Sequence, residues 1–232
     1  PWSIYNHIKK LAPGFFLYFK LNQPDVISVT KYYEIIRREN KHLNYHEAQQ
    51  QLYKLMDDSV EKRLVSDVPL GCFLSGGVDS SVITALAAQK VKQLNTFSIG
   101  YKDEPFYDET QYALEVANMH GTQHHVFKLS NDELYENLDG ILNYIDEPFA
   151  DSSAIAVYIL SKYTRQKVTV ALSGDGADEL FAGYQKHRAE WMVRHQQWLK
   201  PAALLADALL PNQKGSRNSA RQNKVRQLKR LA

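Results

Sequence analysis

A pair of adjacent glycines between two apolar segments is the feature that most constrains the fold of this chain. Residues 68–74 are mostly apolar, residues 75–81 read Ser-Gly-Gly-Val-Asp-Ser-Ser, and residues 82–88 are again mostly apolar. This order predicts a buried strand, a tight turn and a helix. Glycines let the backbone approach a ligand closely, and the helix start offers free N–H groups and the positive end of its dipole. The segment therefore predicts a nest that holds phosphate or pyrophosphate.

Two familiar phosphate-binding patterns do not fit this segment. No Gly-Lys-Ser/Thr follows four residues after a glycine, as it does in a Walker A loop. No third glycine completes the G-x-G-x-x-G pattern of dinucleotide-binding folds. On Ser-Gly-Gly alone, an ordinary strand-to-helix turn with Asp79 as its N-cap is an equal alternative.

Carboxylates gather after a second strand-like segment. Residues 168–172 are β-branched and apolar, and residues 173–184 read Ser-Gly-Asp-Gly-Ala-Asp-Glu-Leu-Phe-Ala-Gly-Tyr. Open α/β sheets bind ligands at the carboxyl ends of their strands. We expect Asp175 and Asp178, three residues apart, to share one face of a helical first turn, with a metal or cationic group between them. For Glu179, a helix N-terminus that favours acidic residues is an equal alternative.

The two segments together resemble the signatures of the glutamine-hydrolysing asparagine synthetase family. The first is similar to the pyrophosphate loop of the N-type ATP pyrophosphatases. GMP synthetases and NAD synthetases also have this loop. The second resembles the signature that distinguishes the asparagine synthetases. The resemblance implies an α/β fold with a parallel sheet and helices on both faces. This is the adenine nucleotide α-hydrolase-like or PP-loop class, followed by the start of an α-helical subdomain.

The resemblance also implies roles for individual residues. Mg²⁺ is held by Asp79 and Asp178, and the catalytic positions are Asp175 and Asp178. Some family members have glutamate in place of Asp175, near the acyl-adenylate. The residues implied to bind ATP and its pyrophosphate are Leu74, Ser75, Gly76, Gly77, Asp79, Ser80, Ser81, Ile99, Ser173 and Gly174.

The activity that the resemblance implies is ATP-dependent formation of asparagine from aspartate through β-aspartyl-AMP. ATP and Mg²⁺ are the implied cofactors, and aspartate and ammonia or glutamine are the implied substrates. A related amidotransferase or a β-lactam or peptide-cyclising synthetase is an alternative, because such enzymes resemble the same pattern. A nucleotide-binding regulatory module is the non-enzymatic alternative. A homodimer is left open.

The domain organisation is expected to have three parts. Residues 1–30 resemble the end of the glutaminase domain that precedes the synthetase domain in this family, and Pro1 is not that domain's N-terminal cysteine. We therefore expect a fragment without glutaminase activity, whose partner is the glutaminase domain of the same protein. Residues 31–185 are expected to form the ATP-pyrophosphatase domain, and residues 186–232 to begin its helical part.

Alternating elements predict the parallel sheet. Strands are expected near 70–74, 95–99, 124–129 and 168–172, and helices near 79–91, 108–119, 131–145 and 153–165. A further helix is expected over 45–65, where apolar groups at 45, 48, 52, 55 and 56 form a stripe that should pack against the sheet. From residue 186 the pattern is helical, with apolar residues continuing through 198–210.

Histidine and cysteine are expected to be structural. His124 and His125 stand at the head of a predicted strand, so they should point to opposite faces and not share a metal ion. Cys72 is the single cysteine, so no intrachain disulfide can form, and its strand position predicts a buried thiol. A reducing, cytoplasmic setting is the natural expectation.

Charge and hydropathy limit the kinds of partner that this chain is expected to bind. The apolar stretches are too short to span a membrane. Seven basic and no acidic residues follow Asp207, which makes a tail that binds nucleic acid or a membrane surface one interpretation. Val225, Leu228 and Leu231 recur at helical spacing and favour an amphipathic helix within a larger helical domain instead. Neither a membrane nor a nucleic acid is therefore an expected partner.

Overall fold

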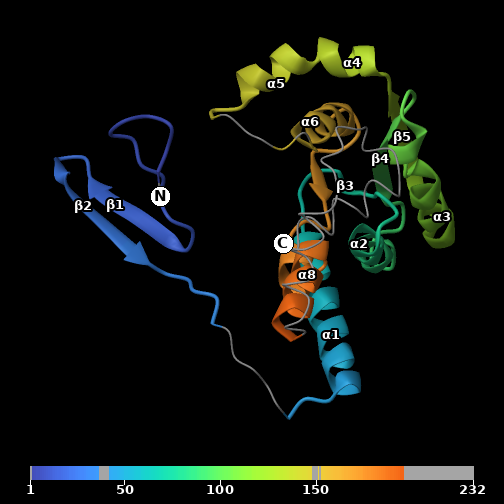
Figure 1. Cartoon of the computed structure of the whole chain (residues 1–232), viewed down its shortest axis with the longest axis horizontal. Helices are drawn as coiled ribbons and strands as arrows, with labels where there is room; N and C mark the ends of the chain where they lie inside the picture. The colour runs from blue at the N-terminus through green and yellow to red at the C-terminus, as the bar shows by residue number, and fades with distance from the viewer. Residues whose placement is uncertain (1, 37–41, 148–150, 152, 196–232) are drawn as a thin grey trace, which may run out of the picture.

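A four-stranded parallel sheet forms the centre of the computed structural model, which describes residues 2–36, 42–147, 151 and 153–195. Its strands lie in the order β5-β4-β3-β6, and Figure 1 shows them beneath α6. They are β3 (Leu70–Phe73), β4 (Asn95–Tyr101), β5 (Gln123–Leu129) and β6 (Val170–Leu172). All four predicted strands are therefore confirmed, with bounds shifted by no more than two residues.

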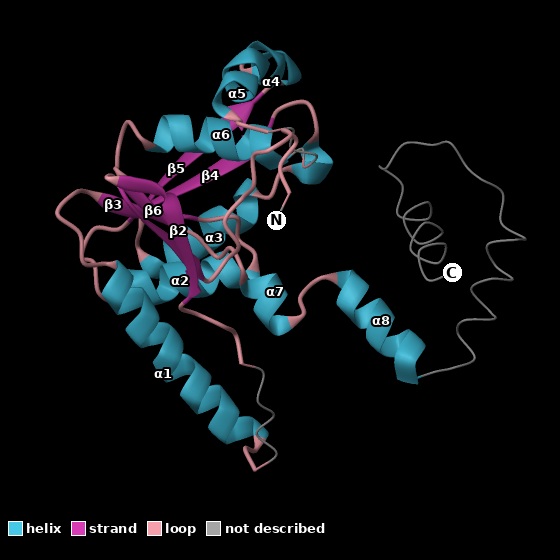
Figure 2. Ribbon diagram, turned by 90° about the vertical axis from the view of Figure 1, so that its left-hand side faces the viewer, coloured by secondary structure: helices cyan, strands magenta, loops and turns pink. Residues whose placement is uncertain are grey.

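Helices cover both faces of this sheet, as Figure 2 shows. One face carries α2 (Val78–Ala88) and α3 (Thr110–His120), and the other carries α6 (Ser153–Thr164). Strand side chains alternate between the two layers, since Cys72 packs with the α2 side chains and Phe97 with Leu160 of α6. Both Cys72 and Phe97 are fully buried. The predicted α/β class with helices on both faces is confirmed.

The order of the strands creates a crevice beside β3. The chain runs outward from β3 to β4 and β5, and then returns to place β6 on the other side of β3. The connections on either side of β3 therefore run in opposite directions. Open α/β sheets bind ligands at such a switch point, outside the carboxyl ends of the strands.

The helix α1 (Tyr45–Arg63) starts with a capping box between Asn44 and Glu47. Its C-terminal half packs against α2 through Val60, with Met56 half-buried beside it. The predicted packing stripe was wrong for Tyr45, Leu52 and Leu55, which are exposed, whereas its last member, Met56, packs against the buried cluster. The physical reason is that only the last turns of this helix reach the layer that covers the sheet, as Figure 2 shows.

The single helix predicted over 131–145 is two helices, α4 (Asn131–Glu136) and α5 (Leu138–Tyr144). At the junction, the side-chain amide of Asn137 donates to the carbonyl of Glu133 at 2.7 Å. That carbonyl is the acceptor that an uninterrupted helix would offer to the N–H of residue 137, so the side chain competes with the helix. The remaining elements are η1 (Pro105–Tyr107), α7 (Ala177–Phe181) and α8 (Gln185–His195). The helical pattern predicted from residue 186 is confirmed for α8, whereas residues 198–210 lie outside the described part.

A separate antiparallel hairpin is formed by β1 (Phe15–Lys20) and β2 (Gln23–Lys31). Figure 1 shows it standing apart from the parallel sheet. Four consecutive apolar residues of β1 point alternately to its two faces and are all about half exposed: Phe16, Leu17, Tyr18 and Phe19. The hairpin therefore leaves apolar side chains uncovered on both faces.

Candidate functional site

A cavity of about 1350 Å³ lies at the carboxyl ends of β3, β4 and β6. Both sequence motifs reach it, which places them at the switch point of the sheet. The predicted site residues that line it are Leu74, Ser75, Asp79, Ser80, Ile99, Ser173, Gly174, Asp175 and Asp178. Gly76 and Gly77 of the adjoining loop and Ser81 in the first turn of α2 do not line the cavity. The structure thus brings together nine of the twelve predicted residues.

Hydrogen bonds between serines hold the first loop in a defined shape. The Oγ atoms of Ser75 and Ser80 lie 2.9 Å apart, and the backbone N–H of Ser75 donates to Ser80 Oγ at 3.2 Å. The N–H of Gly77 donates to Ser75 Oγ at 3.2 Å. Because the N-cap residue of α2 is Gly77, which has no side chain to cap the helix, N–H groups of the first turn stay available to a ligand. The alternative of Asp79 as N-cap was wrong, since Asp79 lies in the first turn.

Two glycines fix how this loop packs. Gly76 has φ +82°, and a Cβ there would meet the Tyr112 Cβ at 2.5 Å and the Ala113 N at 2.6 Å. A Cβ on Gly174 would lie 2.8 Å from the backbone N of Ser80. The first glycine therefore lets the loop touch α3, and the second lets residues 173–184 pack directly on the start of α2. This packing joins the two motifs.

The carboxylates of the second motif are arranged differently from the prediction. The backbone of Gly176 has φ +92°, and α7 begins only at Ala177. Asp178 is therefore in the first turn of a helix, whereas Asp175 precedes it and accepts a hydrogen bond from Ser173 Oγ at 2.9 Å. The expectation that the two aspartates share a helical face was wrong, although both line the cavity.

Sequence reasoning left Glu179 undecided and assigned no role to Tyr184, yet both line the cavity. The Tyr184 hydroxyl donates to Glu179 Oε1 at 2.6 Å. This hydrogen bond raises the pKa of Tyr184 to about 12 and lowers the pKa of Glu179. The phenol therefore stays neutral and the carboxylate ionised throughout the neutral range. The two positions are five residues apart on either side of the end of α7, so no helical or strand periodicity pairs them.

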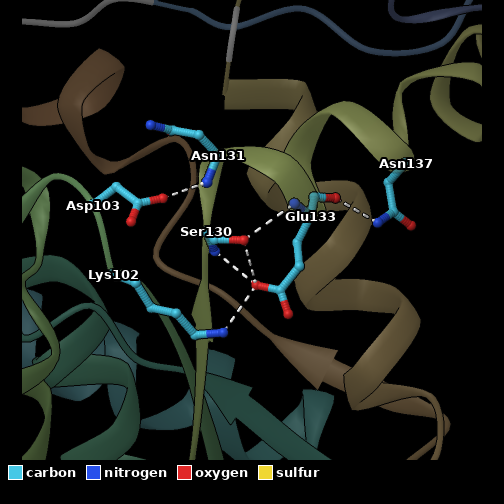
Figure 3. A network of polar contacts seen from close by, with 6 residues as sticks. All are labelled: Lys102, Asp103, Ser130, Asn131, Glu133 and Asn137. Carbon is cyan, nitrogen blue, oxygen red and sulfur yellow. Dashed lines mark hydrogen bonds and ion pairs between the residues drawn. The ribbon is translucent and has the colours of Figure 1, made fainter.

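A further part of the cavity wall is formed by Asn131 and Leu134 at the start of α4. Figure 3 shows the polar network that fixes this helix to the end of β4. The carboxylate of Glu133 accepts from Lys102 Nζ at 3.0 Å and from the N–H of Ser130 at 2.7 Å. Asp103 accepts from the N–H of Asn131 at 2.7 Å. Sequence reasoning missed this wall, although the Ser-x-x-Glu capping box at 130–133 marks the helix start.

Both predicted structural histidines make hydrogen bonds to the neighbouring strand. His124 bonds Thr96 through Nδ1 at 2.9 Å and Ser98 through Nε2 at 3.2 Å, whereas His125 bonds Asn95 at 3.0 Å. The two rings lie on opposite faces of β5, as predicted, and burial lowers the pKa of each. Cys72 is also buried, which raises the pKa of its thiol to about 12. The thiol is therefore uncharged and shielded from solvent, as predicted.

The comparison with protein families identifies the chain. A family model described as asparagine synthase matches residues 51–232, which include both motifs and every residue that lines the cavity. The chain belongs to the asparagine synthase family. Curated relatives in this family include asparagine synthetase [glutamine-hydrolyzing] 1 of Bacillus subtilis, which is 36% identical over 195 residues. Asparagine synthetase [glutamine-hydrolyzing] 3 of the same species is 31% identical over 228 residues.

The chain matches only part of these asparagine synthetases. The two matches cover 81% and 89% of this chain but 29% and 36% of the relatives. The chain thus spans about a third of the length of the curated relatives it matches. Among solved structures, the NH3-dependent NAD synthetase of Campylobacter jejuni aligns with a TM-score of 0.40 and 18% identity, covering 58% of this chain and 60% of its own.

Within residues 2–36, 42–147, 151 and 153–195, no helix combines the length and the apolar character needed to cross a bilayer.

Proposed function

We propose that this chain carries the ATP-dependent synthetase part of an enzyme that converts aspartate to asparagine through β-aspartyl-AMP. The proposal rests on one observation, which is that both motifs line the same cavity. They are brought together there by Gly174, which packs on the first turn of α2. Membership of the asparagine synthase family supports the same activity. The enzyme class is a ligase that forms a carbon–nitrogen bond, with ammonia supplied from glutamine by a glutaminase domain.

ATP is proposed to bind with its β- and γ-phosphates at residues 75–81. The serine hydroxyls and the uncapped first turn of α2 offer donors to phosphate oxygens, and the helix dipole favours the negative charge. The adenosine is proposed to lie toward Ile99, beside Leu74, on the apolar side of the cavity. Ser173 and Gly174 complete the proposed nucleotide contacts. Gly76, Gly77 and Ser81 are proposed to act by shaping the loop.

Asp79 and Asp178 are proposed to hold Mg²⁺. Both line the cavity. The described residues contain no group of three acidic, histidine or cysteine side chains that could bind a metal ion by themselves. Two carboxylates suit Mg²⁺ because this ion usually combines one or two protein carboxylates with substrate phosphates. When bound, the ion would neutralise charge on the pyrophosphate that leaves.

The chemistry then needs positioning more than covalent catalysis. The β-carboxylate of aspartate attacks the α-phosphorus of ATP, which forms an oxygen–phosphorus bond and releases pyrophosphate. Ammonia attacks the resulting acyl carbon, loses a proton and displaces AMP, which gives asparagine. Asp175, held by Ser173, is proposed to face the acyl-adenylate, and both steps depend on groups held in place before reaction.

The domain organisation is part of the proposal. Residues 1–30 are proposed to be the end of a glutaminase domain, which accords with a hairpin whose apolar side chains are uncovered on both faces. Residues 31–185 would be the ATP-pyrophosphatase domain, and residues 186–232 the start of its helical part. We further propose that the enzyme works in the cytoplasm and takes aspartate and ammonia or glutamine as substrates.

The first experiment measures AMP and pyrophosphate release by the complete gene product with ATP, Mg²⁺ and ammonium. Aspartate should be required, and asparagine should form in equal amount. Release that ignores aspartate but needs another carboxylate would move the enzyme to a related amide-forming or lactam-forming synthetase. Absence of release from a folded protein that binds ATP would contradict the ligase proposal and favour a regulatory module.

A further inference from the structure

The turn after α7 contains an alanine and a glycine whose backbone conformations are opposite to the usual preference. Ala182 has φ +55°, in the left-handed region where glycine is normally favoured. Gly183, its neighbour, does not have a positive φ. The backbone therefore does not require glycine at position 183, and another feature must account for the absence of a side chain there.

The carboxylate of Asp178 accounts for it. A Cβ placed on Gly183 would lie 1.9 Å from Asp178 Oδ1 and 3.0 Å from its Cγ. The backbone holds the two residues together, because the N–H groups of Ala182 and Gly183 both approach the carbonyl of Asp178, the latter at 3.0 Å. The space that a side chain at 183 would fill is the space in which the carboxylate lies.

We propose that Gly183 is a positioning residue for the Asp178 carboxylate, an inference that rests on the proposed role of Asp178 as a metal ligand. A methyl group at 183 would force the carboxylate into another rotamer about the Asp178 Cα–Cβ bond. The two nearest atoms belong to the Asp178 side chain, whereas the Asp178 Cα would lie 3.3 Å from the new Cβ, so a small shift of the turn should be enough to retain the fold. Mg²⁺ tolerates little departure from octahedral geometry, so the displaced carboxylate binds it poorly.

The test is the affinity of the complete gene product for ATP, measured by calorimetry in Mg²⁺ and in EDTA. Gly183→Ala should reduce the gain in affinity that Mg²⁺ provides by about tenfold or more, the usual range for a residue that orients a metal ligand. Its affinity in EDTA and its thermal midpoint should stay close to those of the unmodified protein. Ala182→Gly is the matched control, and it should retain the full Mg²⁺ effect because it adds no atom near the carboxylate.

A double-mutant cycle separates this role from a structural one. In the Asp178→Ala background, Gly183→Ala should change the affinity for ATP less than about twofold, because no carboxylate is left to displace. The swapped variant Ala182→Gly/Gly183→Ala places glycine at the left-handed position and should lose the Mg²⁺ effect like Gly183→Ala, so the test survives if the single variant folds poorly.

Three results would overturn the inference, and the third would also contradict the proposed role of Asp178 as a metal ligand. An unchanged Mg²⁺ effect in Gly183→Ala would mean that the carboxylate does not need this space. An equal loss in the Asp178→Ala background would mean that Gly183 acts through the fold. If Asp178→Ala itself keeps the full Mg²⁺ effect, the metal role in the proposed function is wrong, and the inference fails with it.

Discussion

Residues 75–81 and residues 173–184 both follow strands of one sheet, yet they present different chemistry to the same cavity. The first loop offers hydroxyls and backbone N–H groups, and its serines hydrogen-bond to one another. The second offers carboxylates, and its backbone contains two residues with positive φ, Gly176 and Ala182. One loop therefore suits an anion, and the other suits a cation or a reacting centre.

This difference explains why the two loops must touch. Phosphate in the first loop and carboxylates in the second would repel each other unless a cation lies between them. Asp79 is the carboxylate of the first loop, and Gly174 lets the second loop pack against it. Under the proposed function, the contact between the loops places Asp79 and the carboxylates of the second loop where Mg²⁺ would offset the charge of the phosphates.

The largest effect is expected when the charge of Asp79 is removed. In the complete gene product, Asp79→Asn should lower pyrophosphate release about 10²- to 10³-fold, because a neutral amide holds Mg²⁺ poorly. The measurement is the initial rate at saturating ATP. Glu115→Gln, an exposed change on α3 outside the cavity, should retain the normal rate. A folded Asp79→Asn protein with normal pyrophosphate release would contradict the proposed role of Asp79 as a Mg²⁺ ligand.

A backbone change in the first loop should have the next largest effect. Gly76→Ala puts a methyl group against the backbone of α3 at a positive φ, so the free energy of unfolding should fall by about 2–3 kcal/mol. Gly77→Ala should lower it by less than about 1 kcal/mol, since Gly77 has φ −69° and only Ser75 Oγ nearby. Denaturant unfolding of both variants tests the ranking. Equal losses would show that the contact with α3 is unimportant.

Neighbouring serines sharpen the comparison within the first loop. Ser80→Ala removes hydrogen bonds to Ser75 and Gly77, so ATP should bind about tenfold more weakly. Ser81→Ala should have a smaller effect, because Ser81 Oγ is buried, has no hydrogen-bond partner among the described residues and does not line the cavity. Calorimetric titration with ATP measures both. A larger loss in Ser81→Ala would favour direct phosphate contact by that residue.

The smallest effect concerns the sheet beneath the loops. Burial lowers the pKa of His124 below its usual 6.5, so the unfolded chain binds a proton more readily than the folded one. Stability should therefore be constant above pH 6.5 and fall as the pH drops below that value toward the lowered pKa. Urea unfolding at pH 7.5 and 5.5 measures this, and His124→Gln should reduce the difference. An unchanged pH dependence in that variant would exclude His124 as its source.

Much of the fold could be predicted because strands and helices alternate with clear periodicity. The stripe on α1 was misassigned because periodicity identifies an apolar face but not the length over which a neighbour covers it. Tyr45 and Leu55 belong to the helical stripe yet are exposed. The break at Asn137 was missed because it depends on one side-chain hydrogen bond to a backbone carbonyl.

The parts of the candidate site that local sequence determines were predicted. The parts that depend on tertiary structure were missed. A glycine pair indicates the loop at residues 75–81, and clustered acidic residues indicate the one at residues 173–184. The relation of Asp175 to Asp178 depends on the φ of Gly176, which delays the helix start. The pairing of Tyr184 with Glu179 depends on how the chain turns after α7, and the wall at Asn131 depends on the network in Figure 3. None of these follows from spacing alone.

The return of the chain to β3 also has a consequence for folding kinetics. The β3–β6 pairing joins Leu70 to Val170, residues 100 positions apart. Closing so long a segment costs chain entropy before the paired strands compensate for it, so this pairing forms slowly. During synthesis, the first loop emerges from the ribosome well before the strand that completes its cavity. Nucleotide that binds only the completed cavity would therefore favour the last step of folding and draw late intermediates toward the native state.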